Sequence, residues 1–347
     1  MPCRLGCAVR GLCPNERRRL WVLAFAGTTP LLVRGHDRTN AGFNSVIRDS
    51  PAFVRGSSRT MIQDMVWRRT SPGQFIDRKT FMFRFAILLI ALLLATPSFA
   101  ARCGGDFNTF VAAMSAEAQA AGISANVVSS ALGGVQQDMA VLSFDRRQRG
   151  TFNKSFEQYV STRVGPGRIN TGRAMLQRHA ALLSSIEQRF GVPRQILVAI
   201  WGLETDFGKG DMGKLPVFRV LATMAHDCRR SELFQGELLA ALKIVQRGDL
   251  RLNDMIGAYA GEIGQTQFLP SSYIKYGVDF DGNGHVDLRH SVPDVLASTA
   301  NLLHTSGFKM GAPYSEGTAN FEAMREWNRA TIYRKTIGYF ADQLVGR

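Results

Sequence analysis

The feature that most constrains this 347-residue chain is an apolar segment that ends in an acidic residue. Eight consecutive apolar or small residues, 196–203, are followed directly by Glu204. A helix that is apolar on every side belongs inside a protein core. Pro193 suits the first turn of such a helix and Gly208 suits its end. The segment therefore predicts a buried helix with a carboxylate near its C-terminus.

Glu204 is the residue of this helix that points to chemistry. It lies four residues after Ile200 and three after Trp201, on the same apolar side. Burial and the negative end of the helix dipole both disfavour the charged form, so both raise the pKa of the carboxyl group. A carboxyl group with a raised pKa can act as a general acid at neutral pH. The alternative is a structural Glu that ends a buried helix and pairs with an arginine.

The positive charge of the chain, formally +14, is concentrated before residue 101. Residues 101–347 carry 27 Lys and Arg against 23 Asp and Glu, so this part is only mildly basic. It has no basic stripe with interleaved aromatic residues, and we expect no nucleic-acid partner. A mild positive balance suits an anionic polymer.

Residues 81–100 have the three parts of a secretory signal peptide. Basic residues precede an unbroken apolar run, 85–95, and a small-x-small site ends at Ala100. Because the run is too short for a comfortable membrane helix, we expect cleavage near Ala100 and a periplasmic protein without a stable membrane span. An uncleaved anchor is the alternative. Residues 1–80 lack sustained periodicity and are expected to carry no fold, either as an extension from a start codon placed too far upstream or as a disordered prefix.

Two cysteines, Cys103 and Cys228, lie after the expected cleavage site. In an oxidising compartment they can form one disulfide, and two unrelated free thiols are the alternative. Because we expect export, we predict the Cys103–Cys228 bridge.

Helical spacing recurs from residue 106 to the C-terminus, and convincing strand alternation is absent. The fold class is therefore mainly α with little β structure. Residues 101–347 can bury one sizeable core with a cleft, and we expect one domain there. Helices are expected near residues 107–114, 124–132, 152–160, 169–190, 196–208, 217–225, 231–245, 271–276, 293–305, 321–327 and 332–344.

A second motif, Gly-Glu-Ile-Gly-Gln-Thr-Gln-Phe-Leu-Pro-Ser-Ser-Tyr, spans residues 261–273. Its two glycines, three residues apart, allow the backbone to approach a ligand closely. Gln265 and Gln267 supply amide donors and acceptors that suit sugar hydroxyl and acetamido groups. The alternative is a tight, capped loop with surface glutamines.

Three motifs together resemble the lytic murein transglycosylase B family. They are Trp-Gly-Leu-Glu-Thr-Asp-Phe-Gly at 201–208, Asp-Cys-Arg-Arg-Ser-Glu-Leu-Phe at 227–234 and Gly-Gln-Thr-Gln-Phe-Leu-Pro-Ser-Ser-Tyr at 264–273. The likeness covers about residues 103–347 and implies a lysozyme-like helical fold with a central cleft. It implies that Glu204 is the single catalytic acid and base. With this resemblance, the expected substrate-binding residues are Gln265, Gln267, Arg229, Arg230, Tyr259, Trp327 and Asn328.

The resemblance implies cleavage of the β-1,4 bond between N-acetylmuramic acid and N-acetylglucosamine in peptidoglycan, without water, to give a 1,6-anhydro end. One Glu suffices if the 2-acetamido group of the substrate supplies the nucleophile. Asp206 is expected to point away from Glu204, and Glu262 is a candidate for a supporting role. We expect no cofactor for the chemistry, peptidoglycan strands as the partner and a monomer. A hydrolytic muramidase on the same scaffold is one alternative.

One residue departs from the resembled family. Where that family usually has a serine that helps to orient the catalytic Glu, this chain has Ala258. The substitution puts the fine positioning of Glu204 in question. It also favours the other alternative, a weakly active or non-catalytic protein that binds peptidoglycan.

The third motif, Asp-Phe-Asp-Gly-Asn-Gly-His-Val-Asp at 279–287, matches the first nine positions of an EF-hand loop. Position twelve is His290 instead of glutamate, which weakens the site. The resemblance implies a later acidic calcium ligand, and Asp294 fills that place. The expected calcium ligands are Asp279, Asp281, Asn283, the backbone of His285, Asp287 and Asp294. The alternative is a metal-free turn loop.

Overall fold

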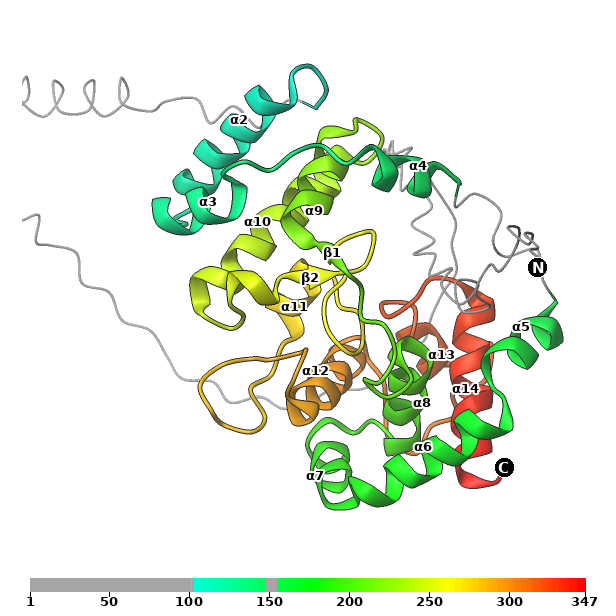
Figure 1. The fold of residues 1–347 in the computed structure, drawn as a ribbon. Coiled ribbons are helices and arrows are strands. Elements are labelled where there is room, and N and C mark those ends of the chain that lie inside the picture. The colour runs from blue at the N-terminus through cyan, green and yellow to red at the C-terminus, as the bar shows by residue number, and fades with distance from the viewer. Residues whose placement is uncertain (1–100, 102, 148–154) are drawn as a thin grey trace, which may run out of the picture. The chain divides into compact units, whose positions relative to one another are not determined.

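The apolar segment forms helix α8, Arg194–Thr205, among the other helices of the fold (Figure 1). The computed structural model describes residues 101, 103–147 and 155–347. All residues from 196 to 205 are buried. Four helices pack against α8: α6 (Pro166–Arg178), α7 (Ala180–Phe190), α12 (Val292–Thr305) and α14 (Thr331–Val345). The prediction of a buried helix that ends near Glu204 is confirmed.

A second group of helices packs around α10, Ser231–Arg247. It comprises α2 (Phe107–Ala120), α3 (Ala125–Leu132), α9 (Val217–His226) and α11 (Pro270–Tyr276), and α4 (Met139–Arg147) packs on α9. Side chains fix where two of these helices begin, because Asp106 and Ser124 accept hydrogen bonds from the first-turn backbone of α2 and α3. Figure 1 shows this group in the upper half of the view and the helices around α8 in the lower half.

Two of these helix predictions are wrong in their extent, and one helix was missed. The single helix expected over 169–190 is two helices, α6 and α7, which meet at a non-helical His179 (φ −105°, ψ 23°). The helix expected over 321–327 is the short α13, Ala319–Ala323, and α4 was not predicted. Of the segment expected over 152–160, α5 (Phe156–Arg163) is described, and residues 152–154 lie outside the described residues.

The described β structure is a pair of two-residue strands and an isolated antiparallel bridge between Ile263 and Phe268. Strand β1, Leu215–Pro216, pairs antiparallel with β2, Ile256–Gly257, in the register Leu215 to Gly257 and Pro216 to Ile256. The 3₁₀ helix η2, Leu252–Asp254, precedes β2. The prediction of a mainly α fold with little β structure is confirmed.

The N-terminal part of the described chain is fastened to the end of α9. Cys103 and Cys228 form a disulfide with 5.1 Å between their Cα atoms, which confirms the predicted pairing. The backbone N–H of Gly104 also donates to the carbonyl oxygen of His226 at 2.9 Å. The bridge therefore joins Cys103, near the start of the described helical domain, to Cys228, the residue immediately before Arg229.

The expected extension at 1–80 and the expected signal peptide at 81–100 lie outside the described residues. Among the helices that the structure does describe, none combines the length and the apolar character that crossing a bilayer requires.

Candidate active site

Glu204 lies in the last turn of α8, where its side chain is buried and hydrogen-bonded. The hydroxyl group of Tyr333 donates to its Oε1 at 2.7 Å, and the indole Nε1 of Trp327 donates to the same oxygen at 3.2 Å. Burial raises the pKa of the Glu204 carboxyl to about 8, although both hydrogen bonds act to lower it. A carboxyl group with this pKa is largely protonated at neutral pH, as a general acid must be.

The two donors come from the C-terminal part of the chain. Tyr333 lies in the first turn of α14, and Trp327 follows α13 and packs edge-on against Phe268, with 5.4 Å between the ring centroids. The side chain of Asn328 accepts the backbone N–H of Ala330 at 2.9 Å, so it shapes the turn that leads into α14. The structure therefore brings the predicted Trp327 to Glu204 and adds Tyr333, which the sequence analysis missed.

The backbone turns sharply directly after Glu204. Asp206 and Phe207 have φ values of 50° and 62°, in the left-handed region that non-glycine residues seldom occupy. Helix α8 therefore ends at Thr205, before the predicted Gly208. The carboxylate of Asp206 forms an ion pair with Arg168 at 2.5 Å, which gives this second acid near the end of α8 a structural partner.

Gln265 is buried, with 7% of its surface exposed. Its Oε1 accepts the indole N–H of Trp201 at 2.9 Å, and its Nε2 donates to the carbonyl oxygen of Arg289 at 2.9 Å. The alternative of a loop with surface glutamines is therefore wrong for Gln265. The expectation that it binds substrate stays a prediction, and a ligand would compete with these internal partners.

Gln267 has a φ of 56° and is only partly buried. Its Nε2 donates to the carbonyl oxygen of Gly264 at 2.8 Å and, more weakly, to that of Met212 at 3.3 Å. Both contacts use the amide nitrogen, so the Oε1 of Gln267 is the group that these bonds leave to accept a hydrogen bond from a substrate hydroxyl group.

The turn 258–262 carries Tyr259 and a second buried acid, Glu262. The carboxylate of Glu262 accepts a hydrogen bond from the backbone N–H of Ala260 at 2.9 Å. The backbone carbonyl oxygen of Glu262 accepts one from the backbone N–H of Ala258, also at 2.9 Å. Burial raises the pKa of Glu262. Tyr259 packs edge-on against Phe144, with 4.6 Å between the ring centroids. Glu262 thus supports the turn that presents Tyr259.

The arginine pair is held by an acid that the sequence analysis did not identify. Asp145, at the end of α4, forms ion pairs with Arg229 and Arg230, each at 2.5 Å, and Asp227 pairs with Arg229 at 2.7 Å. The Asp145 side chain is nearly buried, whereas the two guanidinium groups are partly exposed. The arrangement fixes both cations while leaving part of each accessible.

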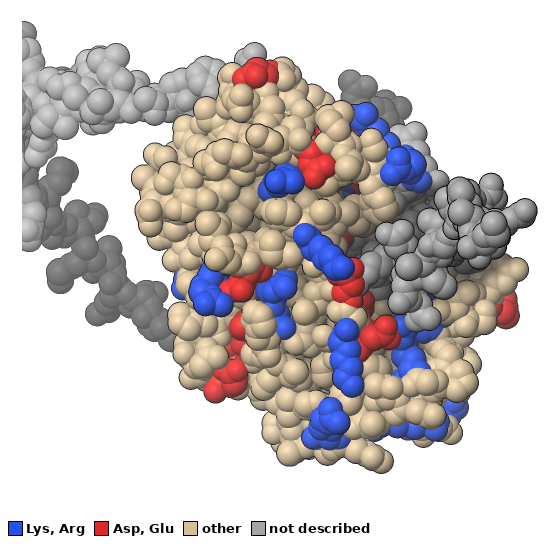
Figure 2. Space-filling view, viewed as in Figure 1, with Lys and Arg blue, Asp and Glu red and all other residues tan. Residues whose placement is uncertain are grey.

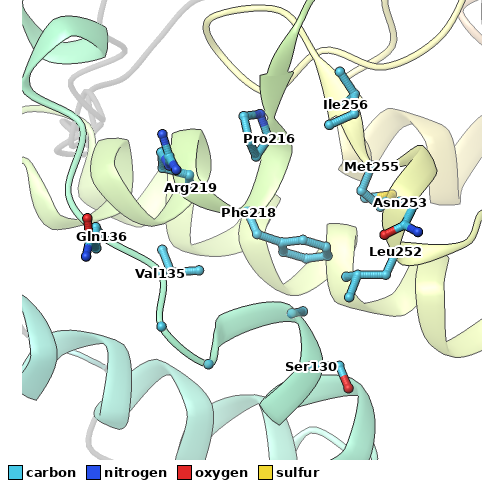
Figure 3. Close-up of a pocket in the computed structure, with 13 residues that line it drawn as sticks. Ser130, Val135, Gln136, Pro216, Phe218, Arg219, Leu252, Asn253, Met255 and Ile256 are labelled. Atoms are coloured by element: carbon cyan, nitrogen blue, oxygen red, sulfur yellow. The ribbon is translucent and has the colours of Figure 1, made fainter.

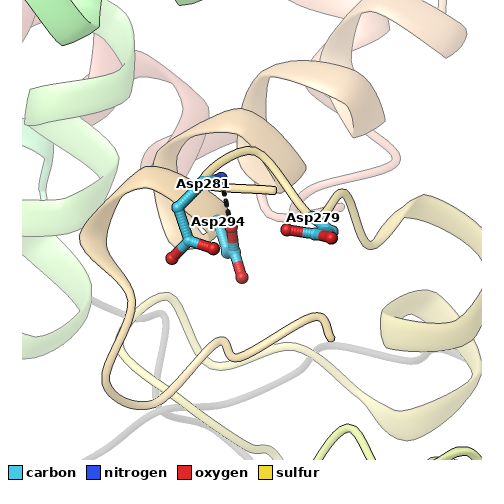
Figure 4. A group of neighbouring side chains, drawn as sticks. All are labelled: Asp279, Asp281 and Asp294. Atoms are coloured by element: carbon cyan, nitrogen blue, oxygen red, sulfur yellow. Dashed lines mark hydrogen bonds between the residues drawn. The ribbon is translucent and has the colours of Figure 1, made fainter. Parts of the chain in front are cut away.

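The acidic loop brings three of the six predicted metal ligands together. Ligand oxygens of Asp279, Asp281 and Asp294 all lie within 4.8 Å of one another (Figure 4). The carboxylate of Asp294 also accepts backbone N–H groups of the loop, from Phe280 at 2.8 Å and from Asp287 at 2.9 Å. Burial raises the pKa of Asp294. Three carboxylates of this kind can hold a hard cation such as calcium.

Two other predicted ligands, Asp287 and Asn283, form hydrogen bonds within the loop. The carboxylate of Asp287 accepts the backbone N–H of His290 and lies 2.9 Å from its ring Nδ1. The side-chain oxygen of Asn283 accepts the backbone N–H of His285 at 2.9 Å. Asp287 lies outside the group of three carboxylates, and its role as a metal ligand stays a prediction.

A pocket of about 450 Å³ lies between the end of α3, the start of α9 and η2 (Figure 3). Phe218, Leu252 and Met255 are apolar residues of its lining, which also includes the basic residue Arg219. None of the residues that line it was predicted as a site residue.

Basic side chains are spread over the face shown in Figure 2, with acidic side chains close to several of them.

Comparison with known proteins identifies the family. Residues 106–318 match the family model described as the transglycosylase SLT domain. Membrane-bound lytic murein transglycosylase B from Escherichia coli (strain K12) is 34% identical over 160 residues, which are 46% of this chain and 44% of that protein. The chain thus matches less than half the length of this curated relative.

Solved structures agree with this match. SltB3 from Pseudomonas aeruginosa, in complex with NAG-anhNAM-pentapeptide, superposes with a TM-score of 0.65 at 32% identity, covering 70% of this chain and 80% of that one. Lytic transglycosylase Slt35 from Escherichia coli, in complex with calcium, gives a TM-score of 0.60 at 24% identity over 71% of this chain and 96% of that one, a likeness in fold. The chain belongs to the transglycosylase SLT domain family.

Proposed function

We propose that this protein is a lytic transglycosylase that cleaves the β-1,4 bond between N-acetylmuramic acid and N-acetylglucosamine in peptidoglycan, without water. The observation that carries the proposal is Glu204, a buried acid with a pKa of about 8, held by Tyr333 and Trp327 in a chain of this family. The complex of SltB3 with a NAG-anhNAM-pentapeptide supports the anhydro product.

The two oxygens of Glu204 have different tasks in this proposal. Both hydrogen bonds reach Oε1, so Oε2 is the oxygen that carries the proton. Oε2 gives this proton to the glycosidic oxygen as the C1–O bond breaks, while the 2-acetamido oxygen of the muramic acid attacks C1. The carboxylate then removes the proton from the C6 hydroxyl group, and O6 attacks C1 and releases the acetamido group. The proton returns to Glu204, and the product is the 1,6-anhydro sugar.

Arg229 and Arg230 are the proposed contacts for an acidic peptide on the glycan strand. Their guanidinium groups are partly exposed, while Asp145 holds them in place. Charge-assisted bonds from arginine suit carboxylates. The pentapeptide in the SltB3 complexes supports a substrate with a peptide stem.

The proposed chemistry needs no cofactor. Asp279, Asp281 and Asp294 would hold a structural calcium ion, and the calcium complex of Slt35 supports this assignment. The hard carboxylate oxygens suit the ion, which would stabilise the loop without taking part in bond cleavage.

We also propose that the protein is exported to the periplasm as a monomer, with residues 101–347 as its catalytic domain and residues 81–100 removed as a signal peptide. The Cys103–Cys228 disulfide supports an oxidising compartment. Sequencing of the protein recovered from the periplasm tests the cleavage site, and a mature N-terminus at Ala101 is the expected result.

Digestion of purified sacculi followed by mass spectrometry tests the activity. Wild-type protein should release anhydro-muropeptides. Glu204→Gln should release them at least about 10³-fold more slowly, because it keeps the shape of the side chain and lacks the transferable proton. Products with reducing ends would instead identify a hydrolytic muramidase. Binding to sacculi without any release would identify a non-catalytic binding protein.

A further inference from the structure

Gln265 bonds to helix α8 on both sides of Glu204. Its side-chain Oε1 accepts the indole N–H of Trp201, three residues before Glu204, at 2.9 Å. Its backbone carbonyl oxygen accepts the hydroxyl group of Thr205, the residue after Glu204, at 2.5 Å. Both hydrogen bonds are buried. A single residue therefore holds the last turn of the helix that carries the acid.

Gln265 is itself held by the segment that follows the acidic loop. Its backbone N–H donates to the carbonyl oxygen of Leu288 at 2.8 Å, and its Nε2 donates to that of Arg289 at 2.9 Å. Leu288 directly follows Asp287, the end of the acidic motif. The backbone N–H, the backbone carbonyl group and both polar atoms of the Gln265 side chain therefore all have partners within the protein.

Two glycines make room for this arrangement. A Cβ atom at Gly208 would collide with the Oε1 and Cδ atoms of Gln265, and one at Gly264 would collide with the carbonyl group of Leu288. Both glycines also have positive φ values, 74° and 82°. The close packing on both sides shows that the position of Gln265 is closely defined.

We propose that Gln265 is a positioning residue, rather than a substrate-binding residue, which fixes the last turn of α8 against the exit of the acidic loop and so keeps Glu204 buried beside Tyr333 and Trp327. The inference deepens the proposed function and rests on it for the catalytic role of Glu204. It does not need any contact between Gln265 and the substrate.

The physical reason is that Glu204 acts as an acid only while it is shielded from water. A small shift of the helix end would hydrate the carboxyl group, stabilise its charged form and lower its pKa. The same shift would move the proton away from the glycosidic oxygen, and a displacement of about 1 Å can reduce turnover about 100-fold.

Two neutral variants of the full-length protein separate the attachments. Gln265→Met keeps the length of the side chain and removes both of its side-chain hydrogen bonds. Thr205→Val keeps the volume of the side chain and removes the bond to the Gln265 carbonyl oxygen, together with the longer bond that the Thr205 hydroxyl accepts from the backbone N–H of Gly208 at 3.1 Å. Gln119→Met, at an exposed position on α2, is the matched control. Thermal unfolding and circular dichroism establish that each variant is folded.

The indole N–H signals in ¹⁵N NMR spectra provide a readout that does not depend on activity. Trp327 donates to Glu204, so its signal reports the ionisation of that carboxyl group, and Trp201 donates to Gln265. Single Trp→Phe variants assign the two signals. In Gln265→Met and Thr205→Val we expect the pH midpoint of the Trp327 signal to fall by about one unit. We expect kcat to fall roughly 10- to 100-fold with a KM within about threefold of wild type.

The inference is overturned if folded Gln265→Met and Thr205→Val both keep the wild-type Trp327 midpoint and kcat. It is also overturned if only KM rises, because that result identifies a substrate contact. A wild-type protein without anhydro products, whose Trp327 midpoint still falls in both variants, would refute the proposed function while supporting the positioning of Glu204 by Gln265.

Discussion

Two opposing effects set the acidity of Glu204, and burial is the larger. Desolvation raises the pKa of this carboxyl group, and the hydrogen bonds from Tyr333 and Trp327 lower it, with a result of about 8. A hydrogen bond that stabilises the carboxylate helps the first step of the proposed reaction, in which Glu204 gives up its proton, and makes the same carboxylate a weaker base for the second step. The site thus balances an acid strong enough to give up its proton against a carboxylate basic enough to take one back.

Tyr333→Phe tests this balance. The substitution removes the 2.7 Å hydrogen bond to Oε1 and leaves the ring. Because that bond lowers the pKa of Glu204, its loss should raise the pKa. The reaction requires protonated Glu204 first, so the rate falls as pH rises through this pKa, and the alkaline limb should move to higher pH in the variant. We also expect kcat to drop about 10-fold, because the carboxylate loses a stabilising donor.

The measurement is kcat/KM for sacculi or a soluble muropeptide between about pH 5 and about pH 10, a range that brackets the raised pKa of the acid. Tyr339→Phe is the matched control, because Tyr339 is exposed on the same helix and should keep the wild-type profile. An alkaline limb that moves to lower pH in Tyr333→Phe would contradict the assigned role of the hydroxyl group.

At this scale the sequence predicted some partners of the site and missed others. Glu204 was predictable because an acid inside an apolar segment is unusual, and Trp327 because it belongs to a motif. Tyr333 and Asp145 were missed, since each lies in an ordinary helical pattern and reaches the candidate site only through a contact distant in sequence. Tyr333 meets Glu204 across 129 residues, and Asp145 meets Arg229 across 84.

At the scale of elements, apolar periodicity located the helices but could not set their limits. Neither glycine nor proline occurs between residues 173 and 190, so nothing in the sequence marks the break at His179 between α6 and α7. Both helices contact α8, one on each side of the break. Similarly, the end of α8 at Thr205 depends on the left-handed backbone conformation of Asp206 and Phe207. It also depends on a contact between Thr205 and Gln265, which lies sixty residues later in the sequence.

Gly208→Ala tests the packing at the end of α8. Its added Cβ would be strained at φ 74° and would collide with the side chain of Gln265. The control is Gly307→Ala, where φ is 94° and nothing lies within 4 Å of the added atom, so only the backbone strain remains. We expect Gly208→Ala to lose roughly 1–3 kcal/mol more unfolding free energy than the control, the usual cost of overpacking. Equal losses in urea unfolding would show that the contact with Gln265 is unimportant.

Asp281→Asn tests the acidic loop. If Asp279, Asp281 and Asp294 hold calcium, the ion should raise the melting temperature of the wild-type protein, and Asp281→Asn should reduce this increase. Asp287→Asn is the control, because the structure places Asp287 outside the group of three and bonds it to His290. Melting temperatures with calcium and with a chelator give the answer. A loss of the calcium effect in Asp287→Asn alone would favour the linear EF-hand arrangement.

At the scale of the whole molecule, the sequence predicted the fold class and the disulfide but not how distant segments share the site. The residues around Glu204 come from α8, the 258–268 loop and the C-terminal segment after residue 318, where the match to the family model ends. Pattern reasoning treats each segment alone, whereas the site exists only after these segments pack. The disulfide was predictable because only two cysteines remain after residue 100.

The bridge itself provides the test at this scale. Cys103 and Cys228 are 125 residues apart, and closing a loop of that length contributes about 4–5 kcal/mol in the chain-entropy model. Cys228→Ser should therefore lower the free energy of unfolding by up to that amount. Because Arg229 follows Cys228 directly, we also expect a higher KM for strands that carry peptide, with little change for bare glycan. Cys103→Ser and the double variant should match Cys228→Ser, since all three break the same bond. Greater destabilisation in the double variant, or unchanged unfolding in either single variant, would show that the two sulfur atoms do not act as one bridge.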